Sequence, residues 1–209
     1  MQRDHGLGFP LRLHPENQSI DFTLSIIEAM ATVPGDIVEC GVWHGQGVIT
    51  MAAYLDHIGS HKHVWGFDSF EGLPAPDEID GRHPRAAEGT FGDTSLPAVE
   101  QLIAICGYTS NITLVEGLFS ETCPKADVDP ISVLVVDCDL YQSYLDVFGS
   151  LYPRVSPGGV VILDEYGRPE KYPGARAATD EFFADMPEGP EFAWWHPHQA
   201  PRWYVRKPI

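Results

Sequence analysis

The sequence is poor in basic residues. It contains 13 Lys and Arg against 30 Asp and Glu, which gives a formal net charge of −17 at pH 7. A field of that sign repels phosphate groups, so the composition argues against nucleic acids and anionic membranes as partners. It does not decide whether the chain forms a homo-oligomer.

Long apolar runs and closely paired cysteines are also absent. No apolar run reaches the length of a membrane span, and the first ten residues, MQRDHGLGFP, lack a signal-peptide core. The four cysteines, Cys40, Cys106, Cys123 and Cys138, form no C-x-x-C pair. Buried thiols in a reducing compartment fit this pattern better than disulfides or a zinc site. We therefore expect a cytoplasmic protein.

Short runs rich in Val, Ile and Leu alternate with helical patterns along the 209 residues, which we expect to form one domain, 1–209. The strand-like runs lie at 36–42, 63–70, 112–119, 131–140 and 159–166, and the helical patterns near 19–31, 45–58, 94–106, 141–152 and 174–185. This alternation predicts an α/β fold with a doubly wound, mostly parallel sheet and helices on both faces. Two last strand-like pieces, EFAWWHP and RWYVRKP, are too close together for a crossover helix. They predict a terminal antiparallel hairpin and a seven-stranded sheet.

Residues 71–95 form a long segment that is rich in Pro, Gly and charge. Its prolines and glycines exclude a continuous helix or strand, and its low apolar content predicts that it does not order itself. Because it follows Asp68 at the end of a strand, we interpret it as a lid over a ligand site. The alternative is a surface loop without a role.

The first strand ends in the sequence VECGVWHGQG, where ligands of open α/β sheets bind. Gly41, Gly45 and Gly47 follow a G-x-x-x-G-x-G spacing, which lets a ligand approach the backbone. Glu39 suits a cationic amine. The dinucleotide fingerprint G-x-G-x-x-G is absent, which argues against a nicotinamide enzyme. A glycine-rich turn with a solvated glutamate is the alternative.

The second and third strands end in residues that suit a nucleoside. Asp68, followed by Ser69, stands where a carboxylate can accept both hydroxyls of a ribose, although it could instead cap a helix. Gly117, in VEGLF at the end of the third strand, can lie against a flat base.

Carboxylates gather at the ends of the fourth and fifth strands. Asp137 and Asp139 end the run VLVVDCDL, and Asp164 and Glu165 end GVVILDEY. If the two strands are neighbours, their ends lie about 4.8 Å apart. Two unit charges 4 Å apart repel by about 4 kcal/mol at an effective dielectric constant near 20, so a proton or a hard cation such as Mg²⁺ must compensate. Such a cation lowers the pKa of a coordinated hydroxyl, whose proton a nearby carboxylate can take. Alternatively, Asp139 caps the next helix and Asp164 faces water.

Taken together, these residues resemble those of class I S-adenosylmethionine-dependent methyltransferases. More narrowly, they look like the macrocin O-methyltransferase family, which methylates sugar hydroxyls of macrolides and related natural products. The matching stretches are GDIVECGVWHGQG, GFDSFEGLP, DCDLYQSY, LYPRVSPGGVVILDEYG and PGARAATDEFF. Two positions depart from the family pattern: His44 stands where we expect Arg or Lys, and Glu165 follows Asp164 where Asp or Asn is usual.

The resemblance implies a Rossmann-like methyltransferase that uses S-adenosylmethionine and Mg²⁺ and acts on a small-molecule acceptor. It assigns the cofactor to Glu39, Gly41, Gly45, Gly47, Asp68, Ser69, Gly117 and Asp137. It assigns the metal to Asp137, Asp164 and Glu165, and residues 1–34 to a cover over the acceptor.

The resemblance makes Asp137 the leading base, with Asp139 supporting the loop or the helix start. Two alternatives stay open at this point. One is a methyltransferase of the same fold that acts on a small phenol, catechol or amine. The other is a non-catalytic module that binds S-adenosylmethionine.

Overall fold

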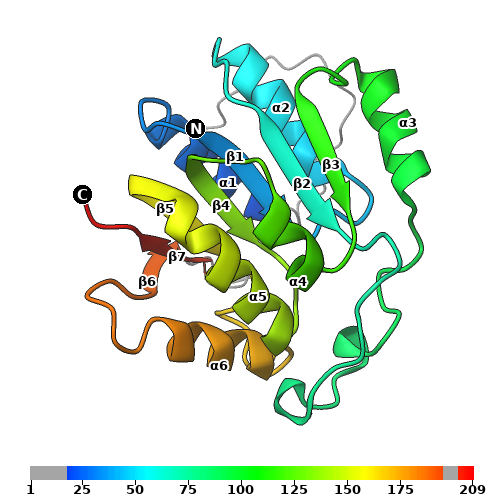
Figure 1. Cartoon of the computed structure of the whole chain (residues 1–209), viewed down its shortest axis with the longest axis vertical. Coiled ribbons are helices and arrows are strands. Elements are labelled where there is room, and N and C mark those ends of the chain that lie inside the picture. Colours follow the sequence, from blue (N-terminus) through cyan, green and yellow to red (C-terminus); the bar gives the residue numbers. More distant parts are fainter. Residues whose placement is uncertain (1–17, 195–201) are drawn as a thin grey trace.

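A computed structural model describes residues 18–194 and 202–209 of the chain. Seven strands form one sheet in the order β3-β2-β1-β4-β5-β7-β6 (Figure 1). The first five strands are parallel to their neighbours, whereas β7 is antiparallel to both β5 and β6. The strands are β1 Asp36–Cys40, β2 Val64–Asp68, β3 Ile112–Glu116, β4 Ile131–Val136, β5 Val155–Leu163, β6 Glu191–Trp194 and β7 Arg202–Arg206.

Helices cover both faces of this sheet. Helices α1, α2 and α3 pack on one face, and α4, α5 and α6 pack on the other (Figure 1). Their bounds are α1 Gln18–Ala29, α2 Gln46–His57, α3 Leu96–Cys106, α4 Phe119–Thr122, α5 Tyr141–Leu151 and α6 Pro173–Phe182. The doubly wound fold with its terminal hairpin is thus confirmed, and only the short α4 was not expected.

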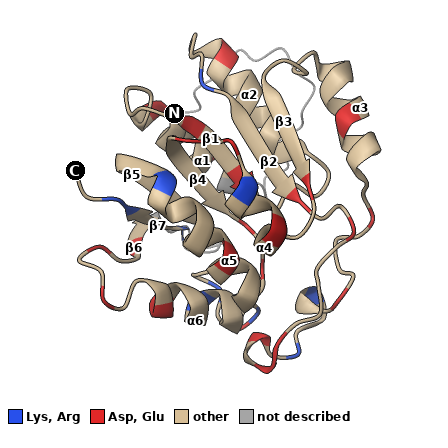
Figure 2. Ribbon diagram, viewed as in Figure 1, with Lys and Arg blue, Asp and Glu red and all other residues tan. Residues whose placement is uncertain are grey.

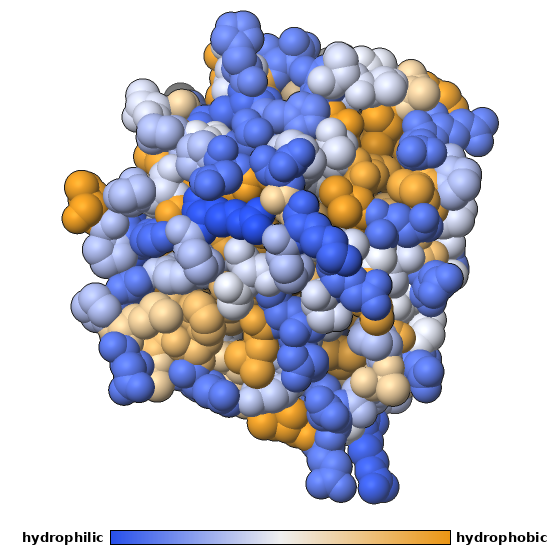
Figure 3. Space-filling model, viewed as in Figure 1, coloured by the Kyte–Doolittle hydropathy of each residue, from blue (hydrophilic) through white to orange (hydrophobic). Residues whose placement is uncertain are grey.

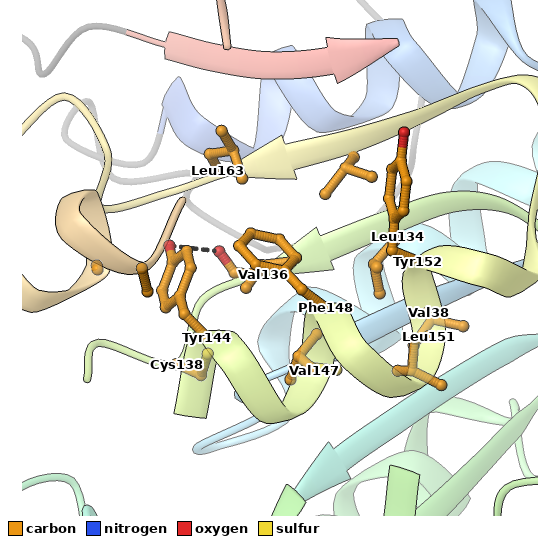
Figure 4. Close-up of a cluster of buried hydrophobic side chains, with 14 of the residues drawn as sticks. Val38, Leu134, Val136, Cys138, Tyr144, Val147, Phe148, Leu151, Tyr152 and Leu163 are labelled. Atoms are coloured by element: carbon orange, nitrogen blue, oxygen red, sulfur yellow. Dashed lines mark hydrogen bonds between the residues drawn. The ribbon is translucent and has the colours of Figure 1, made fainter. Parts of the chain in front are cut away.

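The alternation of side chains along the central strands explains the two-sided core. Ile37 of β1 packs in the cluster under α1 and α2, and its neighbour Val38 packs in the cluster under α5. Both side chains are fully buried, as a parallel strand covered on both faces requires. On the α5 side, Tyr144 and Phe148 fill the layer beside β4, and the Tyr144 hydroxyl oxygen lies 3.1 Å from the Val136 carbonyl oxygen (Figure 4).

The segment 71–95 is folded against the rest of the chain, in contrast to the expectation from its composition. It contains two short 3-10 helices, Glu78–Asp80 and Pro84–Ala86. Asp80 is only 2% exposed, and its carboxylate accepts the amide of Tyr141, the first residue of α5, at 2.7 Å. Polar anchoring of this kind orders a loop without much apolar burial, which is why composition alone was misleading.

The remaining expectations about cysteines and membranes can be compared with the described part of the chain. All four cysteines are free thiols, and Cys40, Cys123 and Cys138 are buried. No helix in the ranges 18–194 and 202–209 has the length and apolar character that crossing a bilayer would require. The face shown in Figure 3 is largely hydrophilic with scattered apolar patches. Elsewhere on the chain, Ile105 of α3 is 74% exposed.

Candidate active site

A cavity of about 430 Å³ opens beyond the carboxyl ends of the parallel strands. The five strands β1 to β5 each contribute a residue at or just after their ends, namely Gly41, Asp68, Gly117, Asp137 and Asp164. The order of the strands reverses between β1 and β4, which is where ligands of such sheets bind. The cavity therefore lies where the strand-end residues of the sequence placed a ligand.

The loop between β1 and α2 brings the backbone close to the cavity at Gly41. This residue has φ +102, and a Cβ atom there would lie 1.7 Å from the carbonyl oxygen of Asp137. Only glycine fits such a position. Gly45 and Gly47 do not line the cavity: Gly45 is the left-handed residue that precedes α2, and Gly47 lies against the carboxylate of Glu39.

Glu39 lies beneath the cavity rather than on its wall. It is 8% exposed, and its Oε2 atom has no hydrogen-bond partner. Burial, followed by the charges of Asp137 and Asp68, raises the pKa of Glu39 well above its usual value. The described residues give this carboxylate no cationic partner, so burial and like charge both disfavour its ionised form.

Asp68 lines the cavity and also organises the loop after β1. Its Oδ2 accepts the amides of Val42 at 2.7 Å and Trp43 at 2.8 Å, and its Oδ1 accepts the amide of Phe70 at 2.8 Å. A carboxylate oxygen can accept more than one hydrogen bond, so the side chain keeps acceptor capacity toward the cavity. Neighbouring Ser69 lines the cavity too, but its hydroxyl donates to the Gly72 carbonyl at 2.9 Å.

Trp43 is a cavity residue that the sequence patterns did not single out. It has φ +47, a backbone conformation that residues other than glycine rarely adopt, and it is 42% exposed. Its indole N–H donates to Asp93 at 2.7 Å, and its carbonyl accepts the Thr94 hydroxyl at 2.8 Å. Its ring also meets Phe91 edge-on at 5.4 Å. Trp43 thereby ties the β1–α2 loop to the end of the segment 71–95.

The acidic residues predicted to converge do so. Asp137, Asp164 and Glu165 each offer a carboxylate oxygen, and these oxygens lie within 4.8 Å of one another. Burial first, then the charges of Asp164 and Asp139, raises the pKa of Asp137 well above its ordinary value. Burial and the charges of Asp137 and Asp164 raise the pKa of Glu165 in the same direction.

Asp164 is the exception, because arginines compensate its charge. Burial alone would raise its pKa, but Arg168 and Arg202 outweigh burial and hold the pKa of Asp164 below its usual value. Arg168 contacts Asp164 Oδ2, and Arg202 Nη1 lies 3.1 Å from Asp164 Oδ1. Neither arginine has a periodic or motif signal along the chain, because Arg168 lies in the turn after β5 and Arg202 lies in β7.

Helix α5 holds Glu165 through a hydrogen bond. Glu165 is 1% exposed, and its Oε2 accepts the hydroxyl of Tyr144 of α5 at 2.7 Å. Tyr144 is fully buried in the core of the α5 side. Only the tertiary contact shows that the same side chain also orients a carboxylate.

Asp139 lines the cavity and does not cap α5. The amide of Tyr141 is taken by Asp80 instead. Asp139 is 7% exposed and has φ +61, which places it on a tight turn after β4. Burial, followed by the charge of Asp164, raises the pKa of Asp139 to about 7.

The cavity also has apolar and aromatic lining residues. The segment 71–95 contributes Leu73, Pro74 and Phe91, and it also contributes Arg85. Leu118 and Phe119, at the start of α4, add to them, and Tyr172, just before α6, lies beside Asp139 and Arg168. A ligand in this cavity would therefore meet apolar and aromatic groups as well as carboxylates. Figure 2 shows acidic residues at the tips of β2 and β3 on the same edge of the sheet.

The donor set suits a hard divalent cation. Asp137, Asp164 and Glu165 offer oxygens alone, which Mg²⁺ and similar ions prefer. They come from adjacent parallel strands, since Val136 of β4 pairs with Leu163 of β5. The residues present therefore fit such an ion, although Asp164 also serves two arginines.

Comparison with known proteins gives a family match over most of the chain. The model of the macrocin O-methyltransferase (TylF) family matches residues 21–186. Demethyldecarbamoylnovobiocin O-methyltransferase of Streptomyces niveus is 36% identical over 159 residues, which cover 73% of this chain and 59% of that protein. Mycinamicin III 3''-O-methyltransferase of Micromonospora griseorubida is 34% identical over 160 residues, covering 72% of this chain and 61% of that protein. The chain thus spans about three fifths of the length of these curated relatives.

Solved structures agree with this match. The O-methyltransferase NovP superposes with a TM-score of 0.74 at 29% identity, covering 92% of this chain and 79% of NovP. The calicheamicin methyltransferase CalS11 superposes with a TM-score of 0.79 at 25% identity, covering 95% of this chain and 82% of CalS11.

The raised pKa of Glu39 can be tested through the pH dependence of the stability of the chain. Its pKa is higher in the folded chain than its ordinary value of 4.5, so the folded chain holds this proton more tightly than the unfolded chain. The resulting stabilisation is fully present below the ordinary pKa of 4.5 and is lost as the pH rises through the folded-state pKa. We expect Glu39→Gln, which mimics the protonated form, to shrink the loss of melting temperature between pH 5 and pH 8 in EDTA.

Glu116→Gln is the matched control for this measurement, because Glu116 also ends a parallel strand but is exposed. The control should keep the pH dependence of the unmodified chain. An identical pH dependence in Glu39→Gln and the unmodified chain would show that Glu39 does not carry a buried charge.

Proposed function

Because the chain belongs to the macrocin O-methyltransferase family, we propose that it transfers a methyl group from S-adenosylmethionine to a hydroxyl of a small molecule, a sugar of a glycosylated natural product. The curated relatives are named as O-methyltransferases of novobiocin, tetracenomycin and mycinamicin compounds. One observation carries the proposal: a single cavity joins a glycine-lined strand end at β1 to a carboxylate cluster at β4 and β5. The free thiols also fit a reducing, cytoplasmic location.

The cofactor would lie over the ends of β1, β2 and β3. Gly41 leaves room for a ligand against the backbone, and Asp68 offers acceptors to the ribose hydroxyls. Gly117 has φ +137 and lines the cavity, so a flat base can pass close to it. Glu39 lies outside the cavity lining, and a cationic amine of the cofactor nearby would favour its ionised form, which burial and like charges disfavour in the free chain.

The acceptor would lie between the carboxylate cluster and the segment 71–95. Asp137 stands at the end of β4 and lines the cavity, so its carboxylate can accept the proton of the acceptor hydroxyl. Burial and the charges of Asp164 and Asp139 raise its pKa, which makes this carboxylate a stronger proton acceptor. Alignment of the hydroxyl oxygen with the methyl group then supplies much of the rate.

A divalent cation, most plausibly Mg²⁺, would be held by Asp137, Asp164 and Glu165. When bound, it would lower the pKa of the acceptor hydroxyl and offset the repulsion among the carboxylates. Tyr144 holds Glu165 by a hydrogen bond in this arrangement, and Asp139 shapes the adjacent turn.

The first prediction concerns the cofactor. Asp68→Ala should weaken binding of S-adenosylmethionine, measured by calorimetry, by about 1–3 kcal/mol, because the ribose hydroxyls lose their acceptor. Glu116→Ala is the matched control, since Glu116 pairs with Asp68 at the end of the neighbouring strand but is exposed and does not line the cavity. Equal affinity in Asp68→Ala and the unmodified chain would refute the assignment of Asp68.

The second prediction concerns the acidic cluster. Asp137→Asn keeps the shape of the side chain but removes a charge and a base, so kcat should fall by about 10²- to 10⁴-fold. Exhaustive chelation should abolish methyl transfer, and Mg²⁺ should restore it. Full activity of Asp137→Asn would exclude it as the base, and full activity after chelation would exclude the cation.

The segment 71–95 would act as a lid over cofactor and acceptor. It leaves the sheet directly after Asp68 and supplies Leu73, Arg85 and Phe91 to the cavity wall. Trp43 ties its far end to the β1–α2 loop through Asp93 and Thr94. Closure would expel water from the reacting groups and strengthen the electrostatic interactions there.

Hydrogen exchange tests the lid. Amides of residues 71–95 should exchange several-fold more slowly with S-adenosylhomocysteine and an accepted glycoside than in the free chain, because closed loops open less often. The amides of α3, which borders the segment but contributes no residue to the cavity, serve as the internal control. Unchanged exchange in 71–95, with protection elsewhere at the cavity, would make the segment a passive connection.

A further inference from the structure

Arg168 places a positive charge among the carboxylates that would hold the cation. It lies in the turn after β5, four residues beyond Asp164. Its Nη2 contacts Asp164 Oδ2, lies 3.2 Å from the Asp164 carbonyl oxygen, and lies 3.4 Å from Glu165 Oε1. One guanidinium nitrogen thus bridges two of the three residues of the donor set.

The second arginine on Asp164 is fixed more firmly. Arg202 belongs to β7, pairs with Trp194 of β6, and is 7% exposed. Arg168 instead lies in a turn and lines the cavity, and its side chain is 25% exposed against 9% for that of Arg202. Its guanidinium carbon lies 5.5 Å from the ring centre of Tyr172, which offers it an alternative contact at the cavity wall. Of the two arginines, Arg168 is the one that faces the cavity and has a second contact within reach.

A bound cation and Arg168 would compete for the same carboxylate oxygens. A cation held by Asp137, Asp164 and Glu165 uses oxygens that Arg168 also contacts at Asp164 and Glu165. Two positive charges a few ångströms apart repel each other, and each would have to share the same lone pairs. Binding of the cation therefore weakens the contacts of Arg168 with Asp164 and Glu165, and these contacts in turn weaken binding of the cation.

We propose that Arg168 is a built-in competitor for the divalent cation: it holds Asp164 and Glu165 together in the metal-free chain and leaves them when the cation binds. This role rests on the cation site of the proposed function. It makes Arg168 a positioning residue whose charge sets the affinity of the site, and it releases a guanidinium at the cavity wall beside the acceptor as the cation enters.

Binding of Mn²⁺, followed at pH 8 by the electron paramagnetic resonance of the free ion, tests this role without any turnover. Arg168→Gln removes the competing charge and should tighten Mn²⁺ binding by about tenfold or more. Arg168→Lys keeps the charge and should bind Mn²⁺ much more like the unmodified chain. Arg176→Gln is the control, because Arg176 pairs with the exposed Asp180 on α6, away from the cluster.

The direction of the change separates this role from a structural one. If Arg168 merely supported the fold, its loss would weaken Mn²⁺ binding. Weaker or unchanged binding in Arg168→Gln would overturn the proposal, as would a lack of binding in both the variant and the unmodified chain. Methyl transfer by the unmodified chain is measured separately. If transfer occurs but Arg168→Gln shows no tightening, the competitor role fails while the proposed function stands.

Discussion

The site depends on holding like charges together at the ends of two adjacent parallel strands. Strands β4 and β5 pair in register, so Asp137 and Asp164 are forced into proximity by the same backbone hydrogen bonds that make the sheet. Each carboxylate in the cluster then needs an opposing interaction. Asp164 obtains it from Arg168 and Arg202, and Glu165 obtains it from the hydroxyl of Tyr144. Asp137 and Glu165 both keep a pKa well above the ordinary value, so a cation or a proton would stabilise them.

Compensation of these charges connects distant parts of the chain. Arg202 reaches the cluster from β7, which exists only because the terminal hairpin adds to β5 in antiparallel register. Tyr144 reaches it from α5, whose start is capped by Asp80 from the segment 71–95. The hairpin and the long segment thus support the carboxylate cluster as well as the fold. On the other side of the cavity, Asp68 performs a similar double task, because it shapes the loop after β1 while it faces the ligand space.

The fold could be predicted because it follows from local patterns. Buried parallel strands produce continuous apolar runs, and the helices between them show helical spacing, so their order was evident along the chain. The list of site residues followed from topology, since parallel strands place their carboxyl ends on one edge. Gly41, Asp68, Gly117 and the carboxylate cluster line the cavity as that rule predicts. Gly45, Gly47 and Glu39 lie behind it, because the first turn of α2 and the side chain of Glu39 pack against each other under the loop.

The sequence by itself therefore determined which segments form strands and helices along the chain, the edge of the sheet where a site was expected, and the acidic character of that edge. Only the tertiary structure decided which groups balance the acids, which residue caps α5, and that the Pro- and Gly-rich segment is ordered. The physical reason is the distance along the sequence between the residues that interact. Periodicity and motif spacing report interactions between residues that are near in sequence, whereas the partners of Asp164, Glu165 and Tyr141 come from other elements. Arg202 lies 38 residues beyond Asp164, and Asp80 lies 61 residues before Tyr141. Such pairings leave no trace in the spacing of the chain and arise only when the sheet and its helices come together.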